Sequence, residues 1–258
     1  MPHGRVFGGQ VLAQALVAAM RTMVDQRAPH SLHSYFLRPG DIAKEIQFSV
    51  EILRDGRSFS ARRVHALQDG KPIFSMIASF QDEDAGLNHQ SEMPKGVTPP
   101  EELPTAAQLL GALDHPVTNY WSKARPFDHR HASEPVNLQP AKEHLAEQLI
   151  LFKALSKLPD DPQLQAAALA YASDYSILES ILRRHGISWA HPGLASASLD
   201  HAMWFHRPAR VDDWLLYVQD SPSAQNGRGL SQGKIFDREG SLIASVAQEG
   251  MLRIPEIS

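Results

Sequence analysis

The spacing of hydrophobic positions in residues 1–81 changes from a helical period to a strand period. After Gly8-Gly9-Gln10, apolar residues recur at helical spacing as far as Met23, which predicts one long helix. The period then becomes two, as is typical of strands, at 34–37, 46–52, 58–64 and 73–80. Asp55-Gly56 and Asp69-Gly70 are hairpin signals between these runs. The segment is therefore predicted to be a helix followed by an antiparallel meander.

The same order of elements returns after a polar stretch. Residues 82–124 have few periodic apolar positions and predict a long surface connection with short helical pieces at best. Asp160-Asp161-Pro162 is a start signal for a helix over 163–171, and Asp174 stands before an apolar helical pattern that Gly186 ends. Strands are predicted at 127–131, 147–155, 197–205, 214–219, 229–236 and 242–251.

Residues in the two halves also match, in the same order along the chain. The matching segments are Phe7-Gly8-Gly9-Gln10 with Tyr171-Ala172-Ser173-Asp174, Leu37-Arg38-Pro39 with His206-Arg207-Pro208, and Asp69-Gly70 with Glu239-Gly240. We interpret this as a duplicated unit in an α+β protein, with a central helix wrapped by an antiparallel sheet in each of two tandem copies. A functional site can then form between the copies.

The copies differ at two polar positions. Asp174 matches Gln10, and Gln248, on the last strand, matches Ala78. Asp174 has two interpretations: an N-terminal cap of the helix that follows it, worth about 0.5–2 kcal/mol, or a catalytic base held at a pocket. Polar groups present in only one copy are the candidates for chemistry.

Composition narrows the range of functions. The 258 residues are 43% hydrophobic and 21% charged, with a formal net charge of −4 and no basic run, so we expect no nucleic-acid partner. There is no cysteine, which excludes disulfides, zinc–thiolate sites and a thiol nucleophile. The sequence shows neither a signal segment nor an apolar run of the roughly 20 residues that cross a bilayer. We therefore expect no membrane span and a cytoplasmic location.

Two other motifs suggest a serine nucleophile or a metal site. Gly229-Leu-Ser231-Gln-Gly233 fits the nucleophile elbow G-x-S-x-G, but that elbow needs a helix after the serine, and here a strand continues. Thirteen histidines, among them His129 with His131 and His201 with His206, suggest a metal, yet their spacing matches no zinc signature. We expect neither a metal nor a cofactor.

Six segments carry a resemblance to a known family. They are Arg5-Val-Phe-Gly-Gly-Gln10, His33-Ser-Tyr-Phe-Leu-Arg-Pro-Gly-Asp41, Arg54-Asp-Gly-Arg-Ser-Phe-Ser-Ala-Arg-Arg63, Ala172-Ser-Asp174, Asp200-His-Ala-Met-Trp-Phe-His-Arg-Pro208 and Val246-Ala-Gln-Glu-Gly250. With them the chain resembles the acyl-CoA thioesterase II family over nearly its whole length. The resemblance implies a double hotdog fold, with an N-terminal hotdog at 1–81, a linker at 82–124 and a C-terminal hotdog at 125–258 carrying the catalytic residues. Relatives have extra residues, including a first strand, ahead of Val6, so we expect either that the first unit lacks an edge strand or that the printed sequence omits the beginning of the protein.

The resemblance implies a site residue by residue. The family's water-positioning Asp, Thr or Ser, and Gln fall on Asp174, Ser198 and Gln248. They imply hydrolysis of fatty acyl-CoA to free fatty acid and coenzyme A, and we expect the backbone of Gly8 and Gly9 to polarise the thioester carbonyl. The alternatives are structural: a strand hydroxyl for Ser198 and a solvent-facing amide for Gln248. We also expect a homo-oligomer, a dimer or a tetramer of double hotdogs.

Four arginines are candidates for binding the coenzyme A phosphates, and two other functions compete with hydrolysis. Arg57, Arg62, Arg63 and Arg228 could each meet a phosphate, but Arg62 and Arg63 point to opposite faces of one strand and solvated charge is an equally good explanation. Of these four, Arg228 is our candidate for binding the phosphates of coenzyme A. Other functions considered are a hotdog dehydratase or hydratase, which would pair a helix-borne acid with a histidine, and a non-catalytic acyl-CoA-binding protein.

Overall fold

The first unit is a helix followed by four strands. The computed structural model describes residues 4–24, 27–111, 113–114 and 116–255. Helix α1 spans Gly8–Met20, and the strands are β1 (Ala28–Phe36), β2 (Gln47–Asp55), β3 (Phe59–Gln68) and β4 (Lys71–Gln81). This is the predicted order, with β1 beginning several residues earlier than its alternation indicated.

As far as residue 255, where the described part of the chain ends, the second unit contains two helices and seven strands. Its elements are β5 (Phe127–His131), β6 (Glu147–Ala154), α4 (Pro162–Ser173), α5 (Glu179–Arg184), β7 (Ala195–Ser198), β8 (Asp200–Phe205), β9 (Leu215–Gln225), β10 (Arg228–Phe236) and β11 (Leu242–Arg253). In its described residues, the connection carries short helical turns: η1 (Pro100–Glu102), α2 (Ala106–Leu110), α3 (Pro116–Asn119) and η2 (Tyr120–Ala124).

One antiparallel sheet runs through both units. Its order is β2-β3-β4-β1-β8-β11-β10-β9-β6-β5, and β7 also pairs with β11. The block β2-β3-β4-β1 has the same order as β9-β10-β11-β8, which is what a duplicated unit requires. Strands β1 and β8 pair antiparallel where the blocks meet, with Leu32 opposite Met203.

The two edges of these blocks differ. Strand β9 pairs with β10 on one side and with β6 on the other. Within the described residues, its counterpart β2 pairs with β3 alone and is largely exposed. The outer edge of β2 is thus an open edge of the sheet.

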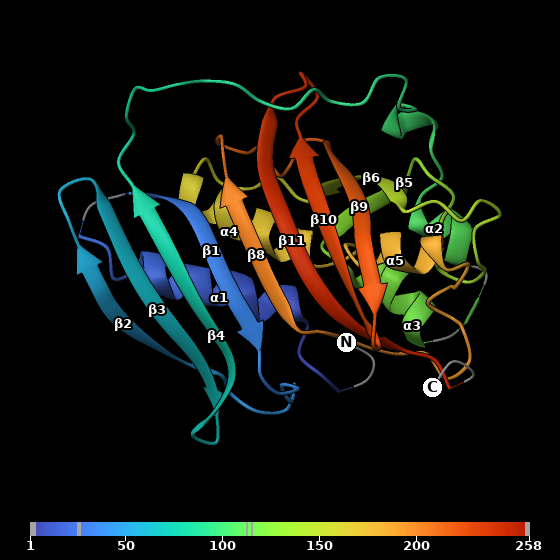
Figure 1. Cartoon of the computed structure of the whole chain (residues 1–258), viewed down its shortest axis with the longest axis horizontal. Coiled ribbons are helices and arrows are strands. Elements are labelled where there is room, and N and C mark those ends of the chain that lie inside the picture. Colours follow the sequence, from blue (N-terminus) through green and yellow to red (C-terminus); the bar gives the residue numbers. More distant parts are fainter. Residues whose placement is uncertain (1–3, 25–26, 112, 115, 256–258) are drawn as a thin grey trace.

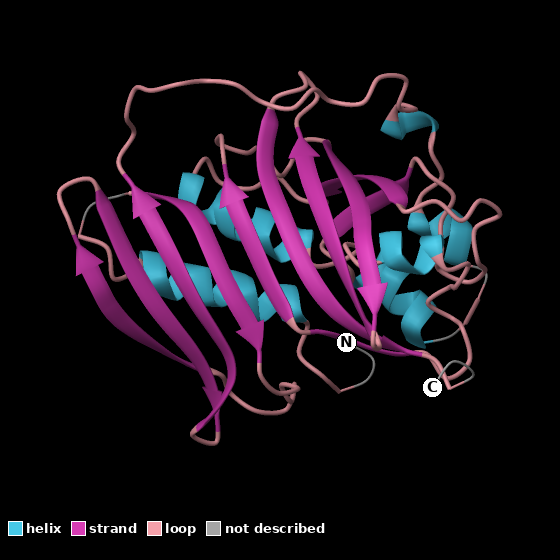
Figure 2. Cartoon of the chain, viewed as in Figure 1, coloured by secondary structure: helices cyan, strands magenta, loops and turns pink. Residues whose placement is uncertain are grey.

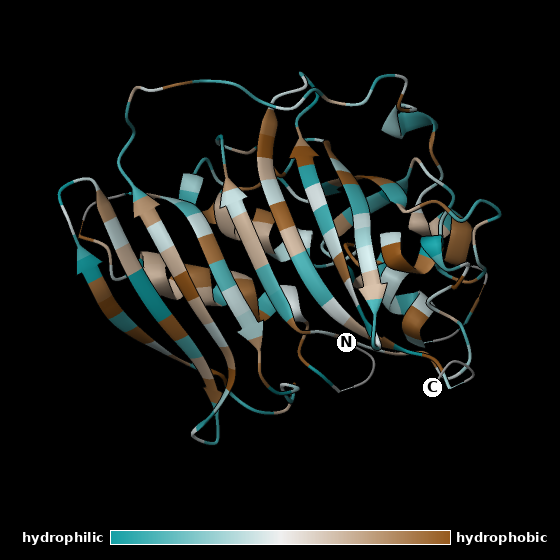
Figure 3. Ribbon diagram, in the orientation of Figure 1, coloured by the Kyte–Doolittle hydropathy of each residue, from teal (hydrophilic) through white to brown (hydrophobic). Residues whose placement is uncertain are grey.

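Helices α1 and α4 lie next to each other behind the sheet (Figures 1 and 2). Small side chains are frequent in both helices, and Ala15, Ala19 and Ala170 are almost completely buried in the core that the helices share with the sheet. Along the strands, hydrophobic and hydrophilic residues alternate (Figure 3), so that one face of the sheet covers the helices. This packing places the N-terminal end of α1 beside the C-terminal end of α4.

Two hairpins have the backbone that their sequences favour. Asp69 and Gly70 have φ of 49° and 73°, and Asn226 and Gly227 have φ of 53° and 71°. Two consecutive positive φ values define the type I′ turn, whose twist matches that of the flanking strands. These turns fix the registers β3–β4 and β9–β10. The second of these registers sets where the final strand β11, with Gln248, lies.

Candidate active site

Asp174 lies at the junction of the two units. It follows the last residue of α4, and α5 begins only at Glu179 with Leu178 as its N-cap. The prediction that Asp174 caps the following helix is therefore wrong. Its Oδ2 instead accepts a hydrogen bond of 2.7 Å from the backbone N–H of Gly9, in the first turn of α1. The carboxylate caps a helix of the other unit, whose own N-cap residue Phe7 offers no side-chain acceptor.

Both glycines at the start of α1 are needed for this approach. A Cβ on Gly8 would lie 2.7 Å from Asp174 Oδ2 and 3.0 Å from the ring of Phe36. A Cβ on Gly9 would lie 2.4 Å from the carbonyl oxygen of Tyr171. No larger residue fits between α1 and the end of α4, so these glycines serve close contact. The helix has ordinary negative φ values there.

Ser198 and Gln248 complete a chain of hydrogen bonds to the carboxylate. Ser198 Oγ donates to Asp174 Oδ1 over 3.4 Å, and Gln248 Nε2 donates to Ser198 Oγ over 2.9 Å. Gln248 is 1% exposed, which rules out the solvent-facing alternative. The strands β7 and β11 carry these two side chains and pair with each other, Ser198 lying opposite Gly250. The structure thus brings together the three residues predicted from the sequence.

His201 extends the chain, although the sequence had suggested it only as a possible metal ligand. Its Nδ1 is hydrogen-bonded to Gln248 Oε1, and its Nε2 lies 3.0 Å from Ser173 Oγ. The ring is fully buried on β8. Burial lowers the pKa of His201 to about 4, although the contact with Gln248 acts in the opposite direction, so the ring is neutral at pH 7.

The pKa of Asp174 is raised to about 6. Burial is the main cause, because it penalises the charged form, and hydrogen bonds from Gln248, Gly9 and Ser198 oppose it. A carboxylate with this pKa is ionised at neutral pH yet accepts a proton readily. That combination suits a general base.

A cavity of about 630 Å³ opens beside Asp174 and Ser198. Both units and the connection contribute to its wall, which is mostly apolar. Residues that line it include Phe7, Gly8, Val11, Phe36, Phe74, Tyr175, Leu178, Trp189 and Leu199. Three arginines also line it: Arg5, Arg38 and Arg125.

The connection contributes more than the sequence indicated. Val117, Tyr120 and Trp121 of the connection line the cavity together with the adjacent Arg125, although 82–124 was interpreted as a surface segment. The guanidinium of Arg125 lies 4.5 Å from the centre of the Tyr175 ring, next to Asp174 in the chain. The cluster of two aromatic residues before Arg125 is the one signal that could have revealed this role.

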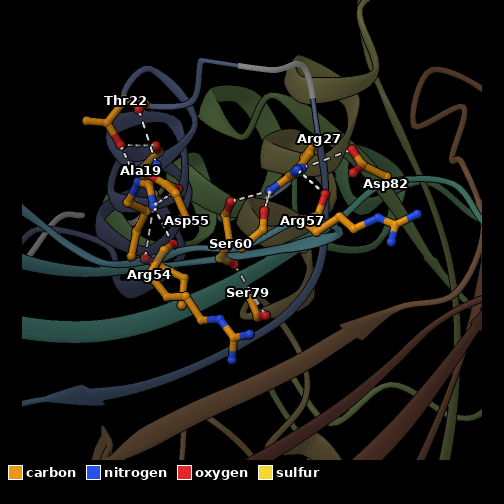
Figure 4. Close-up of polar contacts among 12 residues, drawn as sticks. Ala19, Thr22, Arg27, Arg54, Asp55, Arg57, Ser60, Ser79 and Asp82 are labelled. Atoms are coloured by element: carbon orange, nitrogen blue, oxygen red, sulfur yellow. Dashed lines mark hydrogen bonds and ion pairs between the residues drawn. The ribbon is translucent and has the colours of Figure 1, made fainter.

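Two of the arginines considered for phosphate binding, Arg62 and Arg63, have structural partners. Arg62 is completely buried, forms an ion pair of 2.8 Å with Asp55 and donates to Thr22 after the end of α1, while Arg63 pairs with Glu51. Figure 4 shows the neighbouring Arg27 bound to Ser60, Asp82 and the carbonyl of Arg57. These contacts hold the C-terminal end of α1 against β3.

Arg228 lies away from the cavity. It forms an ion pair of 3.1 Å with Glu249 and lines a separate pocket beside His185 and Leu252. Of the residues predicted to bind substrate, Gly8 lines the site and Gly9 contacts Asp174, but Arg228 is not brought to them.

The two competing motifs have structural roles. Ser231 is fully buried within β10 and shares a hydrogen bond with Ser180, so no nucleophile elbow forms. His131 bonds to Glu179. Burial alone would raise the pKa of Glu179, but the charge and hydrogen bond of His131, with Gln148 and Arg125, hold it below its usual value. Over the described ranges, no three His, Asp or Glu side chains converge as a metal site.

The chain is similar to known proteins over almost its full length. The family model described as acyl-CoA thioesterase matches residues 122–251, and the model of the acyl-CoA thioesterase N-terminal domain matches residues 1–81. Acyl-CoA thioesterase 2 of Haemophilus influenzae is 40% identical, covering 98% of this chain and 89% of its own. Human acyl-coenzyme A thioesterase 8 is 36% identical, covering 100% and 84%. The crystal structure of an acyl-CoA thioesterase II from Mycobacterium marinum is 44% identical, with a TM-score of 0.82 over 99% of this chain and 92% of that one.

Proposed function

Since this chain belongs to the acyl-CoA thioesterase family, as a double hotdog thioesterase II that hydrolyses acyl-CoA thioesters, we propose that Asp174 is its general base. The observation that supports this proposal is the position of the carboxylate at an apolar cavity. One of its oxygens accepts a hydrogen bond from the first unit and the other accepts one from the second unit. Fixed in this way, the carboxylate can accept a proton from a water in the cavity without rearrangement.

In the proposed reaction, the oxygen of that water forms a bond to the thioester carbonyl carbon while Asp174 takes one of its protons. Ser198 and Gln248 hold the carboxylate and the water in line. The tetrahedral intermediate then collapses, the C–S bond breaks, and the coenzyme A thiolate leaves and takes up the proton from Asp174, which restores the ionised base. Because a thiolate is a good leaving group, no covalent acyl-enzyme is required.

We assign the stabilisation of the carbonyl oxygen to the start of α1. Gly8 lines the cavity, and its backbone N–H has no acceptor among the residues that the structure describes. The N–H groups at a helix N-terminus carry a partial positive charge. The same helix end therefore binds the carboxylate through Gly9 and can polarise the thioester through Gly8.

The substrates that fit are fatty acyl-CoAs. The wall of the cavity is rich in aromatic and aliphatic side chains that would pack against a hydrocarbon chain. Fatty acid and coenzyme A would then be the products.

The proposal is tested with Asp174→Asn, which keeps the size of the side chain and an acceptor for Gly9. Thiol release from acyl-CoAs of graded chain length should fall by about 10²–10⁴-fold, as for loss of a positioned base. Asp220→Asn, at an exposed position of β9, is the matched control. Full hydrolysis by a folded Asp174→Asn protein would refute the assignment.

We further assign contact with the coenzyme A phosphates to Arg38 rather than Arg228, because Arg38 is exposed at the cavity and Arg228 is paired elsewhere. Arg38→Gln should raise KM for acyl-CoA several-fold but leave KM unchanged for an acyl N-acetylcysteamine thioester, which has no phosphates. Arg228→Gln should change neither. The reverse pattern would assign the phosphates to Arg228.

The alternative reactions find less support. A hotdog dehydratase would need a histidine free to reach substrate, but His201 is fully buried and both its ring nitrogens are engaged. A purely binding role would not explain why Gly9, Ser198 and Gln248 form a hydrogen-bonded set around Asp174. Saturable thiol release separates hydrolysis from both.

We also propose self-association and a cytoplasmic location. The outer face of the sheet at the junction of β1, β4 and β8 exposes Tyr35, Ile77 and Trp204, which a second copy could cover. In the part of the chain that the structure describes, no helix combines the length and hydrophobicity needed to cross a membrane.

A further inference from the structure

We propose that His201, with its proton on Nδ1, is a positioning residue that fixes the amide of Gln248 so that Ser198 donates to the carboxylate of Asp174. The inference rests on the proposed role of Asp174 as the base. Its geometric support is one chain of contacts: Ser173 to His201, His201 to Gln248, Gln248 to Ser198, and Ser198 to Asp174.

The direction of this chain follows from donors and acceptors. An ionised carboxylate only accepts hydrogen bonds, so Ser198 must donate to Asp174 and must itself accept from Gln248 Nε2. Gln248 Oε1 then faces His201, and an acceptor at that place requires a proton on Nδ1. The base, the hydroxyl and the amide thus determine the tautomer of the histidine.

Reversing the tautomer gives a site without a base. With its proton on Nε2, His201 would donate to Ser173, whose hydroxyl can donate to the carbonyl of Ala170. Gln248 would have to turn its Nε2 towards Nδ1 and its Oε1 towards Ser198. Ser198 would then donate to Gln248, and Asp174 could keep its contact with Ser198 only as the protonated acid.

The duplicated unit provides an independent reason to connect His201 with Gln248. In the first unit, Leu32 and Ala78 are direct partners across β1 and β4. In the second unit the ladder of β8 and β11 reaches Ala202 opposite Ala247, and the next residues are His201 and Gln248. One copy thus has an apolar pair where the other has a hydrogen-bonded polar pair.

The titratable groups nearest this arrangement are His201 itself, two buried tyrosines and Asp200, which precedes His201 on β8 and whose pKa is raised by burial. The neutral state of His201 is favoured by its burial. The titratable side chains that sense the charge of Asp174 are Tyr171 and Tyr217, from α4 and β9, and burial raises the pKa of both. Tyr217 donates to the carbonyl of Ser173. Ser34, from β1, contacts only the backbone carbonyl of His201.

Three substitutions of His201 separate its two contacts. His201→Asn places an amide nitrogen near the position of Nδ1 and should retain kcat within about threefold. His201→Gln reaches the position of Nε2 and His201→Phe makes neither bond, so both should lower kcat about 10–100-fold, the usual cost of losing a residue that orients a catalytic group. KM should stay within about twofold for all three, because His201 does not line the cavity.

The pH profile separates positioning from a packing role. Without a donor on Oε1, Gln248 turns more freely, Asp174 loses donors, and its pKa rises. The acidic limb of kcat/KM should therefore move to higher pH in His201→Phe and His201→Gln, but not in His201→Asn. His206→Asn is the matched control, since His206 is bonded to Ser245 on the outer face of the sheet.

A measurement on the unmodified protein makes the test independent of folding and activity. The ¹⁵N shifts of His201 at neutral pH should show a protonated Nδ1 and a bare Nε2. A protonated Nε2, an unmoved acidic limb in His201→Phe, or equal losses in all three variants would overturn the proposal. Retained hydrolysis by Asp174→Asn would instead refute the base, and the ¹⁵N result would still report the tautomer.

Discussion

Asp174 is held in a charged state that the fold does not favour. Its pKa is about 6 in the folded protein, whereas an unperturbed Asp has a pKa near 3.9. Between these two values the folded chain binds more protons than the unfolded chain, so stability falls as the pH rises from about 4 to about 6. Above pH 6 the full loss of unfolding free energy caused by burying the ionised carboxylate remains. Catalysis needs this ionised form at the same pH.

Asp174→Asn should therefore increase stability while removing activity. The gain in unfolding free energy at pH 7.5 should be on the order of 2–3 kcal/mol, from about 1.4 kcal/mol per pKa unit, and should vanish near pH 4. Chemical denaturation of both proteins at these two pH values measures it. An equal difference at both pH values would mean that packing, and not the charge, is responsible.

Sequence analysis identified this residue but not its structural partner. The helical pattern after Asp174 suggested a local cap, whereas the N–H it binds belongs to Gly9, 165 residues away in the chain. Capping rules describe neighbours in sequence, so they cannot reveal a helix capped by another unit. The comparison of the two halves succeeded because it asked which polar groups lacked a counterpart. Extended from Gln248 to its neighbouring strand, that comparison would also have found His201 at the position that matches Leu32 in the first copy.

Helix α1 depends on small residues at its start. The predicted helix was correct except at its ends, because the apolar spacing continued to Met23 while the regular helix stops at Met20. From the sequence, its two glycines were expected only to polarise the thioester carbonyl through their backbone. Their function, to admit a carboxylate and the backbone of α4, depends on packing that the sequence does not display.

Replacing Gly8 with Ala should lower activity more than stability. The new methyl group would lie at 2.7 Å from Asp174 Oδ2, so the carboxylate must move away from the water and from Gly9. We expect a fall in kcat of at least about tenfold, measured by thiol release.

The control for this prediction is Gly86→Ala. Gly86 has open space around its Cα and no positive φ. The Gly86→Ala protein should retain the activity of the unmodified protein. Full activity in Gly8→Ala would show that the carboxylate tolerates displacement.

At the scale of the whole molecule, the two units share one sheet and one site. The repeat predicted two tandem units, each a helix with an antiparallel sheet, and the identical strand orders agree with it. It could not predict that β1 and β8 pair, because hydrophobic alternation does not specify which strand lies beside which. Nor could it predict that the connection lines the cavity, since residues 117–125 have no regular period.

Hydrogen exchange tests how far the units are joined. Amides of β1 and β8 pair in the middle of the sheet, whereas β2 and β5 lie at its edges. We expect exchange of β1 and β8 to require global unfolding and to be among the slowest in the chain. Exchange at this junction as fast as at β2 would indicate two units that open independently.

The single base has a consequence for stoichiometry. The chain contains two copies of the hotdog unit but one carboxylate–amide set, since Gln10 and Ala78 occupy the matching places in the first copy. A thioether analogue of the substrate, which cannot be hydrolysed, should saturate at one molecule per 28.6 kDa chain. A mutation in the first unit consequently alters the cavity wall on one side and leaves the other side unchanged. In a homodimer of identical hotdogs, the same mutation would appear in both subunits and so at both equivalent positions.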